Sequence, residues 1–186
     1  MTTGMPRRPD VTDIDVIGGT EIRQLEVVDY DPGWADTYGE HEERLRTALR
    51  DRDVAIEHIG STSVPGLAAK PIIDILVTVD DITAEEDYLP GLLAADYVLR
   101  VREPGHRLVR TPARDVHVHI YEKNHEAVTN YRLFRDRLRV DAGDRALYAA
   151  TKQELIQRGF DDMNAYSDAK TDVIAAILRR ARAAQG

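Results

Sequence analysis

The segment EHIGSTSVPGLAAKPIIDILV, from Glu57 to Val77, holds two apolar runs separated by a Gly-Ser turn and a short loop. The run VAIEHI (54–59) predicts a short strand, and PIIDILVTV (71–79) is typical of a longer strand buried on both faces of a sheet. Asp74 lies inside this second run. Because a carboxylate in a central strand is costly unless it is paired, hydrogen-bonded or bound to a metal, Asp74 predicts a polar partner nearby.

Two interpretations of Asp74 are open from the residues alone. In the first, its carboxylate accepts hydrogen bonds from the preceding loop and only stabilises the fold. In the second, it belongs to a binding site, which the turn favours because a glycine and hydroxyl side chains directly after a strand can hold an anion. The turn comprises Gly60, Ser61, Thr62 and Ser63. Since side chains alternate along a strand, Asp74 shares its face with Leu76.

The first half of the chain predicts helices on either side of this segment. Asp31 and Pro32 are expected to start an amphipathic helix as its N-cap and first residue. The apolar face of that helix comprises Trp34, Tyr38, Leu45 and Leu49. Further on, Thr83 and Glu86 predict a capping box for a second helix, which Pro90 should kink or shorten.

The second half predicts strands followed by helices. DYVLRV (96–101), RLVRTP (107–112) and DVHVHIYE (115–122) form an expected antiparallel meander, and three helical segments follow from His125 onward. The whole pattern is that of an α+β fold, one sheet with helices packed against it. Residues 1–20 lack periodicity and predict a flexible tail, so residues 21–186 are expected to form a single domain.

Composition narrows the classes of function. The chain of 186 residues has 33 acidic and 25 basic residues and a formal charge of -8, so bulk binding to nucleic acid or to an anionic membrane is not expected, although a local basic groove stays open. There is no cysteine, so any metal must be bound through oxygen or nitrogen. No stretch approaches the ~20 apolar residues of a membrane span, and the chain is expected to be cytoplasmic.

A strand ending in Gly-Ser, a spacer and an acid in an apolar strand resemble the organisation of the nucleotidyltransferase (polymerase-beta-like) fold. More specifically, HIGSTSVPGLAAKPIIDI (58–75) resembles the signature of the GrpB family, which is assigned to that fold. The resemblance extends to DPGW (31–34), HVH (117–119), FRDRLR (134–139) and two Tyr-x-x-x-Lys helices, and spans about residues 25–182. It implies a mixed sheet with flanking helices, a C-terminal helical cap and a Gly-Ser turn that binds phosphates.

The metal ligands expected of that fold are only partly present. Two-metal nucleotidyl transfer uses two acids at alternate positions of one strand and a third acid on a neighbouring strand. The position two after Asp74 is Leu76, which cannot bind a metal. On the later strand, Asp115, His117 and His119 share one face.

If these two strands are neighbours, Asp74, His117 and His119 are candidate catalytic and metal-binding residues, with Asp115 as a further ligand. The resemblance implies Mg²⁺ or Mn²⁺ before Zn²⁺, whereas mixed histidine and carboxylate ligation suits Mn²⁺, Fe²⁺ or Zn²⁺ better than Mg²⁺. The alternative stays open that both histidines form hydrogen bonds across the sheet or receive a phosphate or carboxylate ligand.

Cationic side chains are the other candidates for the site. Lys70 directly precedes the Asp74 strand, where an ammonium group would meet phosphate oxygens. Arg132, Arg135 and Arg139 recur at helical spacing and form a basic stripe that could clamp an anion, while Asp136 could pair with one of them.

Two tyrosine-lysine pairs and one histidine each have both a structural and a functional interpretation. Tyr148 and Lys152 are an i, i+4 pair of the kind usually found on a solvated helix surface. A second such pair, Tyr166 and Lys170, is expected to line the pocket because of the family resemblance. His58 is expected to be a hydrogen-bonded core histidine.

These observations predict that the protein binds a nucleotide or another phosphorylated small molecule. Nucleotidyl transfer stays open, but the missing second acid predicts weak or absent Mg²⁺-dependent transfer. Two alternatives remain. One is a non-catalytic binding module linked to coenzyme A metabolism, because similar domains occur fused to dephospho-CoA kinase; the other is a His/Asp metal-dependent hydrolase.

Overall fold

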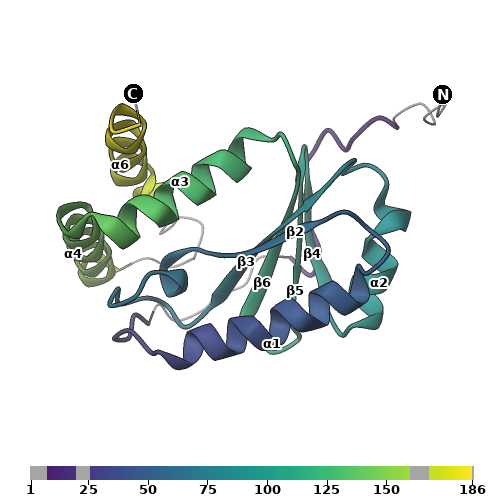
Figure 1. Cartoon of the computed structure of the whole chain (residues 1–186), viewed down its shortest axis with the longest axis horizontal. Helices are drawn as coiled ribbons and strands as arrows, with labels where there is room; N and C mark the ends of the chain where they lie inside the picture. Colours follow the sequence, from purple (N-terminus) through teal and green to yellow (C-terminus); the bar gives the residue numbers. More distant parts are fainter. Residues whose placement is uncertain (1–7, 20–25, 160–167, 186) are drawn as a thin grey trace.

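A six-stranded mixed sheet with the strand order β1-β4-β5-β6-β3-β2 forms the centre of the molecule (Figure 1). The computed structural model describes residues 8–19, 26–159 and 168–185. The strands are β1 (Asp15–Val16), β2 (Ala55–Ile59), β3 (Ile73–Val79), β4 (Val98–Glu103), β5 (His106–Arg110) and β6 (Val116–Glu122). Neighbouring strands are antiparallel except β3 and β6, which are parallel. The expected meander, β4-β5-β6, is therefore confirmed.

Helices cover both faces of this sheet. They are α1 (Gly33–Ala48), α2 (Leu89–Ala94), α3 (Glu126–Val140), α4 (Ala142–Arg158) and α6 (Thr171–Ala183). Helices α1 and α2 lie on one side, α3 lies on the other, and α4 and α6 pack against α3 at one end of the molecule (Figure 1). The mixed sheet, the flanking helices and the C-terminal helical cap are as the sequence predicts.

The alternation of side chains along β3 divides the core between the two faces. Ile73, Ile75 and Val77 are buried against α1 and α2 in the larger apolar cluster. On the opposite face, Leu76 is buried in a smaller cluster that includes Val128 of α3. Because burying each such side chain contributes about 1.5–3 kcal/mol, both faces of β3 are held firmly in place. Asp74 thus lies on the face that α3 covers.

Two predicted helix starts need correction. Helix α1 begins at Gly33, one residue later than expected, and the Asp31 carboxylate accepts a hydrogen bond from the Gly33 N–H at 2.8 Å. The capping box at Thr83 is wrong, because the Thr83 hydroxyl donates to the Asp81 carboxylate at 2.6 Å. A short 3-10 turn follows, and Pro90 lies in the first turn of α2, where its missing N–H costs nothing.

Part of the expected flexible tail is attached to the sheet. Within residues 8–19, β1 extends the sheet by pairing with β4. The Asp10 carboxylate accepts hydrogen bonds from the Gly105 N–H and from the buried Arg107 guanidinium, both at 2.6 Å. The partners of this segment lie about 90 positions further along the chain, so local sequence does not reveal them.

Among the described residues, no helix is long and apolar enough to cross a membrane.

Candidate functional site

The parallel pairing of β3 with β6 brings the polar side chains of both strands together. Asp74 is opposite His117, and Leu76 is opposite His119. The Asp74 Oδ1 atom lies 3.2 Å from His119 Nε2 and 3.9 Å from His117 Nδ1. One ligand atom from each of these three residues lies within 4.8 Å of the others. The predicted convergence of Asp74, His117 and His119 is therefore confirmed.

Asp115 lies outside this group. It is exposed just before β6, and its Oδ1 accepts a hydrogen bond from the Thr111 hydroxyl at 2.5 Å. The carboxylate thereby supports the turn between β5 and β6. The structure does not bring it to the other three ligands.

The ionisation of Asp74 and His117 suits cation binding. Burial acts to raise the pKa of the Asp74 carboxyl, but the hydrogen-bonding contact with His119 and nearby charge, including that of Lys170, outweigh it and lower the pKa. Burial lowers the pKa of His117 to about 4 despite the opposing charge of Asp74, so its imidazole is neutral near pH 7. His117 Nε2 is buried and has no hydrogen-bond partner among the described residues. A neutral imidazole is the form that binds metals.

Gly60 places the Gly-Ser turn directly against Asp74. Its φ of 72° and ψ of -175° belong to a region that essentially only glycine adopts. A Cβ atom at this position would lie 2.7 Å from Asp74 Oδ2. The glycine is therefore required both by the backbone and by the close approach of the carboxylate.

The hydroxyl groups of the turn have different roles. Thr62 and Ser63 are buried: Thr62 Oγ1 donates to the Ile72 carbonyl at 3.1 Å and contacts His58 Nε2 at 3.0 Å, and Ser63 Oγ donates to the Gly60 carbonyl at 2.6 Å. These two hydroxyls stabilise the turn, and the contacts of Thr62 and Ser63 with a ligand stay a prediction. Only Ser61 in the turn directs its hydroxyl toward the helical cap. His58 is a hydrogen-bonded core residue, as predicted.

Lys152 of α4 is buried beside the Gly-Ser turn, where its position in the sequence did not predict it. Its side chain is only 3% exposed, and Nζ donates to the Ala68 carbonyl at 2.5 Å and to Ser61 Oγ at 3.2 Å. The ammonium also lies 4.9 Å from the ring centre of Tyr148, which is 4% exposed. Burial, with a smaller effect of Lys170, lowers the pKa of Lys152 to about 7. The prediction that Tyr148 and Lys152 lie on a solvated helix surface is wrong. Their spacing, which is the same as that of Tyr166 and Lys170, would have indicated a similar role for the two pairs.

Two other predicted lysines lie near the cluster. Lys170 is half-buried, and its pKa is lowered by burial while the Asp74 carboxylate acts in the opposite direction, so the two groups are close enough to interact. Lys70 is also half-buried, and its charge contributes to the lowered pKa of His117. Tyr166 lies outside the described residues.

The arginines of the basic stripe on α3 form ion pairs and hydrogen bonds within the chain. Arg132 and Arg135 form ion pairs with the Glu57 carboxylate of β2 at 2.5 and 2.9 Å. Arg135 also pairs with Asp136 at 2.7 Å, as foreseen for that aspartate, and Arg139 donates to the Ser63 carbonyl. Because Glu57 faces α3, the Arg135 guanidinium is paired with a carboxylate of the chain itself. Its contact with a ligand stays a prediction.

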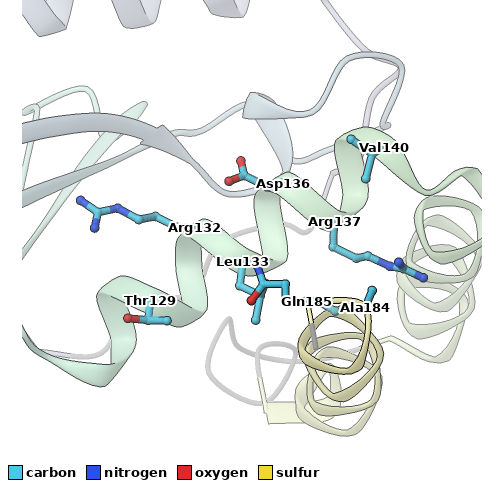
Figure 2. A pocket seen from close by; sticks show the side chains of 9 residues that line it. Thr129, Arg132, Leu133, Asp136, Arg137, Val140, Ala184 and Gln185 are labelled. Carbon is cyan, nitrogen blue, oxygen red and sulfur yellow. The ribbon is translucent and has the colours of Figure 1, made fainter.

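An open groove of about 450 Å³ lies elsewhere on the surface (Figure 2). Side chains of α3 and of the C-terminal end of α6 line it, including Leu133, Val140 and Ala184. It shares no residue with the Asp74 cluster. The groove is therefore a feature separate from the polar site.

Comparison with known sequences reveals close relatives of this chain. The profile of the family described as GrpB protein matches residues 24–180. A UPF0157 protein of Streptomyces coelicolor is 63% identical over 179 residues, which are 96% of each chain. A dephospho-CoA kinase of Mycolicibacterium paratuberculosis is 31% identical over 186 aligned residues, and the similar region is 84% of this chain but 46% of the kinase.

Comparison with solved structures agrees with the fold described above. The crystal structure of the conserved protein GrpB from Enterococcus faecalis matches with a TM-score of 0.74 and 32% identity, covering 84% of this chain and 96% of that chain. The Cid1 poly(U) polymerase with MgGTP bound matches with a TM-score of 0.50 and 17% identity, covering 70% of this chain and 43% of the polymerase. At that identity the second likeness shows a shared nucleotidyltransferase-like fold and nothing further.

Proposed function

The chain belongs to the GrpB family, and we propose that it binds a nucleotide or another phosphorylated small molecule beside a divalent metal ion. The observation that carries this proposal is the convergence of Asp74, His117 and His119 within 4.8 Å on a half-buried face of the sheet. A carboxylate with two imidazoles is a ligand set for a divalent ion. When bound, the ion would polarise a phosphoryl oxygen.

The donor set fits one ion better than two. The position that would carry a second carboxylate is Leu76, which is fully buried among Ile59, Tyr121 and Val128. Leu76 itself has no oxygen or nitrogen that could bridge two ions. With two nitrogen donors and one carboxylate, the site favours Mn²⁺, Fe²⁺ or Zn²⁺ over Mg²⁺.

The helical cap supplies the positive charge that a phosphate needs. Lys170 interacts electrostatically with Asp74, and Lys152 contacts Ser61 of the Gly-Ser turn. The lowered pKa of Lys152 means that its ammonium is destabilised by burial near pH 7. An anion beside it would relieve that cost, so these groups favour an anionic ligand over a neutral one.

Binding is favoured over nucleotidyl transfer. The charge that develops on a transferred phosphoryl group is normally neutralised by metal ions, and Leu76 removes a ligand that the two-metal arrangement needs. Pyrophosphate release with Mg²⁺ is therefore expected to be weak or absent. The similarity to part of a dephospho-CoA kinase adds coenzyme A precursors to the candidate ligands of a non-catalytic module.

A thermal-shift screen tests this proposal. Each nucleoside triphosphate and dephospho-CoA is added alone and with Mn²⁺, Zn²⁺ or Mg²⁺; ligand at 100 times Kd should stabilise the native chain by about 2.7 kcal/mol. We expect the largest rise in Tm with a phosphorylated ligand plus Mn²⁺ or Zn²⁺, and loss of the metal-dependent part in Asp74→Asn. A shift with nucleotide alone would favour a metal-free binding module, and a metal shift that no phosphorylated ligand increases would favour the His/Asp hydrolase.

A further inference from the structure

A second imidazole and a second carboxylate lie directly behind His119. The His119 Nδ1 atom is 3.3 Å from His106 Nε2, and His106 Nδ1 is 2.5 Å from Glu103 Oε1. On its other side, His119 Nε2 is 3.2 Å from Asp74 Oδ1. Four polar groups therefore follow one another in a row, with a carboxylate at each end and two histidines between them.

The pairing of β5 with β6 creates this row. His106 is opposite Tyr121 in the ladder, and Leu108 is opposite His119, so the two histidines are diagonal neighbours on one face. His106 is 7% exposed and stacks on Tyr121, with ring centres 4.4 Å apart. Its imidazole is therefore held in place, whereas the Glu103 side chain is 34% exposed and reaches the surface.

Hydrogen atoms in this row can be counted. Each of the three contacts needs one hydrogen between its two heavy atoms, and ionised carboxylates supply none. Two neutral imidazoles carry one N–H each, which leaves one contact without a hydrogen. A metal cation can take the place of the hydrogen that this contact lacks. A cation next to Asp74 completes the row, because the two N–H groups then satisfy the contacts of His119 with His106 and of His106 with Glu103.

We propose that His106 and Glu103 are positioning residues that hold His119 as the Nδ1–H tautomer and thereby present its Nε2 lone pair to the metal. This inference rests on the proposed metal site and deepens it. Metal-binding histidines commonly donate their second N–H to a carboxylate or carbonyl, which orients the ring and raises the basicity of the ligand. Here a second histidine relays that contact to the carboxylate.

A pair of variants separates positioning from packing. His106→Phe keeps an aromatic ring against Tyr121 but removes the acceptor for the His119 N–H. His106→Gln removes the ring but keeps an amide that can donate to Glu103 and accept from His119. Zn²⁺ affinity, measured at fixed neutral pH by competition with a chromophoric chelator, should fall about 10–100-fold in His106→Phe and stay closer to wild type in His106→Gln. Equal affinities in His106→Phe and wild type, or weaker binding in His106→Gln than in His106→Phe, would overturn the proposal.

Nuclear magnetic resonance provides a readout that packing alone would not move. Long-range ¹H–¹⁵N spectra of the Zn²⁺-loaded wild type should place hydrogen on Nδ1 of both His119 and His106. The variant Glu103→Ala removes the carboxylate at the surface end of the row with little effect on the core. It should weaken Zn²⁺ binding measurably, but less than His106→Phe does. Hydrogen on His106 Nε2, with a bare Nδ1 facing Glu103, would contradict the positioning role.

The two proposals fail in different ways. If wild-type protein binds no Zn²⁺, the metal site itself is wrong, and the spectrum of the metal-free chain then tests the hydrogen-bonded row alone. In that chain hydrogen must still reside on His106 Nδ1, and its absence there would overturn the inference. If wild type and both His106 variants bind Zn²⁺ equally, the metal site stands and the positioning role is wrong.

Discussion

At position 60 any side chain would collide with the carboxylate of Asp74. We predict that Gly60→Ala lowers the free energy of unfolding by about 1–3 kcal/mol, because alanine is forced into backbone angles that essentially only glycine adopts. The new methyl group should also displace Asp74 and abolish the metal-dependent rise in Tm. Urea denaturation, followed by the thermal-shift assay on the folded variant, measures both effects.

Gly39 offers a matched control within α1. A Cβ atom built there meets nothing within 4 Å, and its backbone is helical. Gly39→Ala should therefore stabilise the protein by up to about 1 kcal/mol through helix propensity and leave ligand binding unchanged. If Gly60→Ala has the same free energy of unfolding and the same metal-dependent rise in Tm as Gly39→Ala, the site does not depend on the packing of the turn against Asp74.

The buried ammonium of Lys152 predicts a distinct pH dependence of stability. Its pKa of about 7 in the folded chain lies below the ordinary value of 10.5, so between these pH values the unfolded chain binds more protons than the folded chain. Stability contributed by this residue therefore increases with pH across that window, at most by about 1.4 kcal/mol per pH unit. Lys152→Met, which keeps the apolar stem, should lack this increase. Parallel stability profiles of wild type and Lys152→Met between pH 7 and 10 would contradict the assignment.

Individual residues also mark what the sequence could and could not predict at the site. Asp74 was identified because a carboxylate in an apolar strand needs a partner, and its two histidine partners were found by their alternation along the later strand. The roles of Thr62 and Ser63 could not be read in the same way. Their hydroxyls donate to the Ile72 and Gly60 carbonyls, and these hydrogen-bond partners are known only from the folded structure of the turn.

Among the secondary-structure elements, α3 is attached to the sheet through Glu57. Burial acts to raise the pKa of this carboxyl, but Arg132 and Arg135 outweigh burial, so the pKa is lowered below its ordinary value. The contribution of Glu57 to stability is therefore present at neutral pH and is lost as the pH falls through the lowered pKa. We predict that Glu57→Gln reduces the free energy of unfolding by about 1–3 kcal/mol at neutral pH. The difference from wild type should shrink in acid. Denaturant titrations at several pH values measure this.

An exposed ion pair provides the comparison for this prediction. Glu154 and Arg158 lie four residues apart on α4, and each side chain is 63% exposed. Glu154→Gln should change stability by less than about 0.5 kcal/mol, because solvent screens such a pair. A loss in Glu57→Gln no larger than that in Glu154→Gln would show that α3 is held by its apolar contacts alone.

The adjacency of β3 and β6 could not be predicted from the sequence, although the orientation of their side chains could. Alternation predicts which side chains share a face of one strand, and this was correct for both β3 and β6. It does not say that the two strands are adjacent, since more than 30 residues separate them and the parallel pairing is a property of the whole sheet. Likewise, helical spacing correctly grouped the arginines of α3 but could not identify Glu57 as their partner.

The whole molecule assembles the candidate site from two parts. The sheet contributes Asp74 and the histidines, whereas the helical cap contributes Lys152, which contacts Ser61, and Lys170, which interacts with Asp74. Val64 and Leu67, which follow the turn, are buried against α3, α4 and α6. Apolar packing therefore aligns the cap with the sheet, and it places positive charge locally in a chain whose net charge is -8.

The sequence predicted the overall architecture correctly but not the structure of the N-terminal segment. The α+β sheet and the cap followed from the pattern of elements and from the family resemblance. Residues 8–19 were expected to be loose because they lack periodicity. Their attachment depends on Asp10 with Arg107 and on the Arg100 contacts to the Ile17 and Gly19 carbonyls, all of which join distant parts of the chain.

Anomalous diffraction from a crystal soaked with Mn²⁺ and a nucleoside triphosphate tests the central proposal most directly. We predict one manganese peak bound by Asp74, His117 and His119, with a phosphate group between the ion and the Lys152 and Lys170 ammonium groups. The Gly-Ser turn should contact that phosphate through Ser61 or the local N–H groups. A crystal that binds the triphosphate elsewhere, or that shows no manganese at these three residues, would contradict the account.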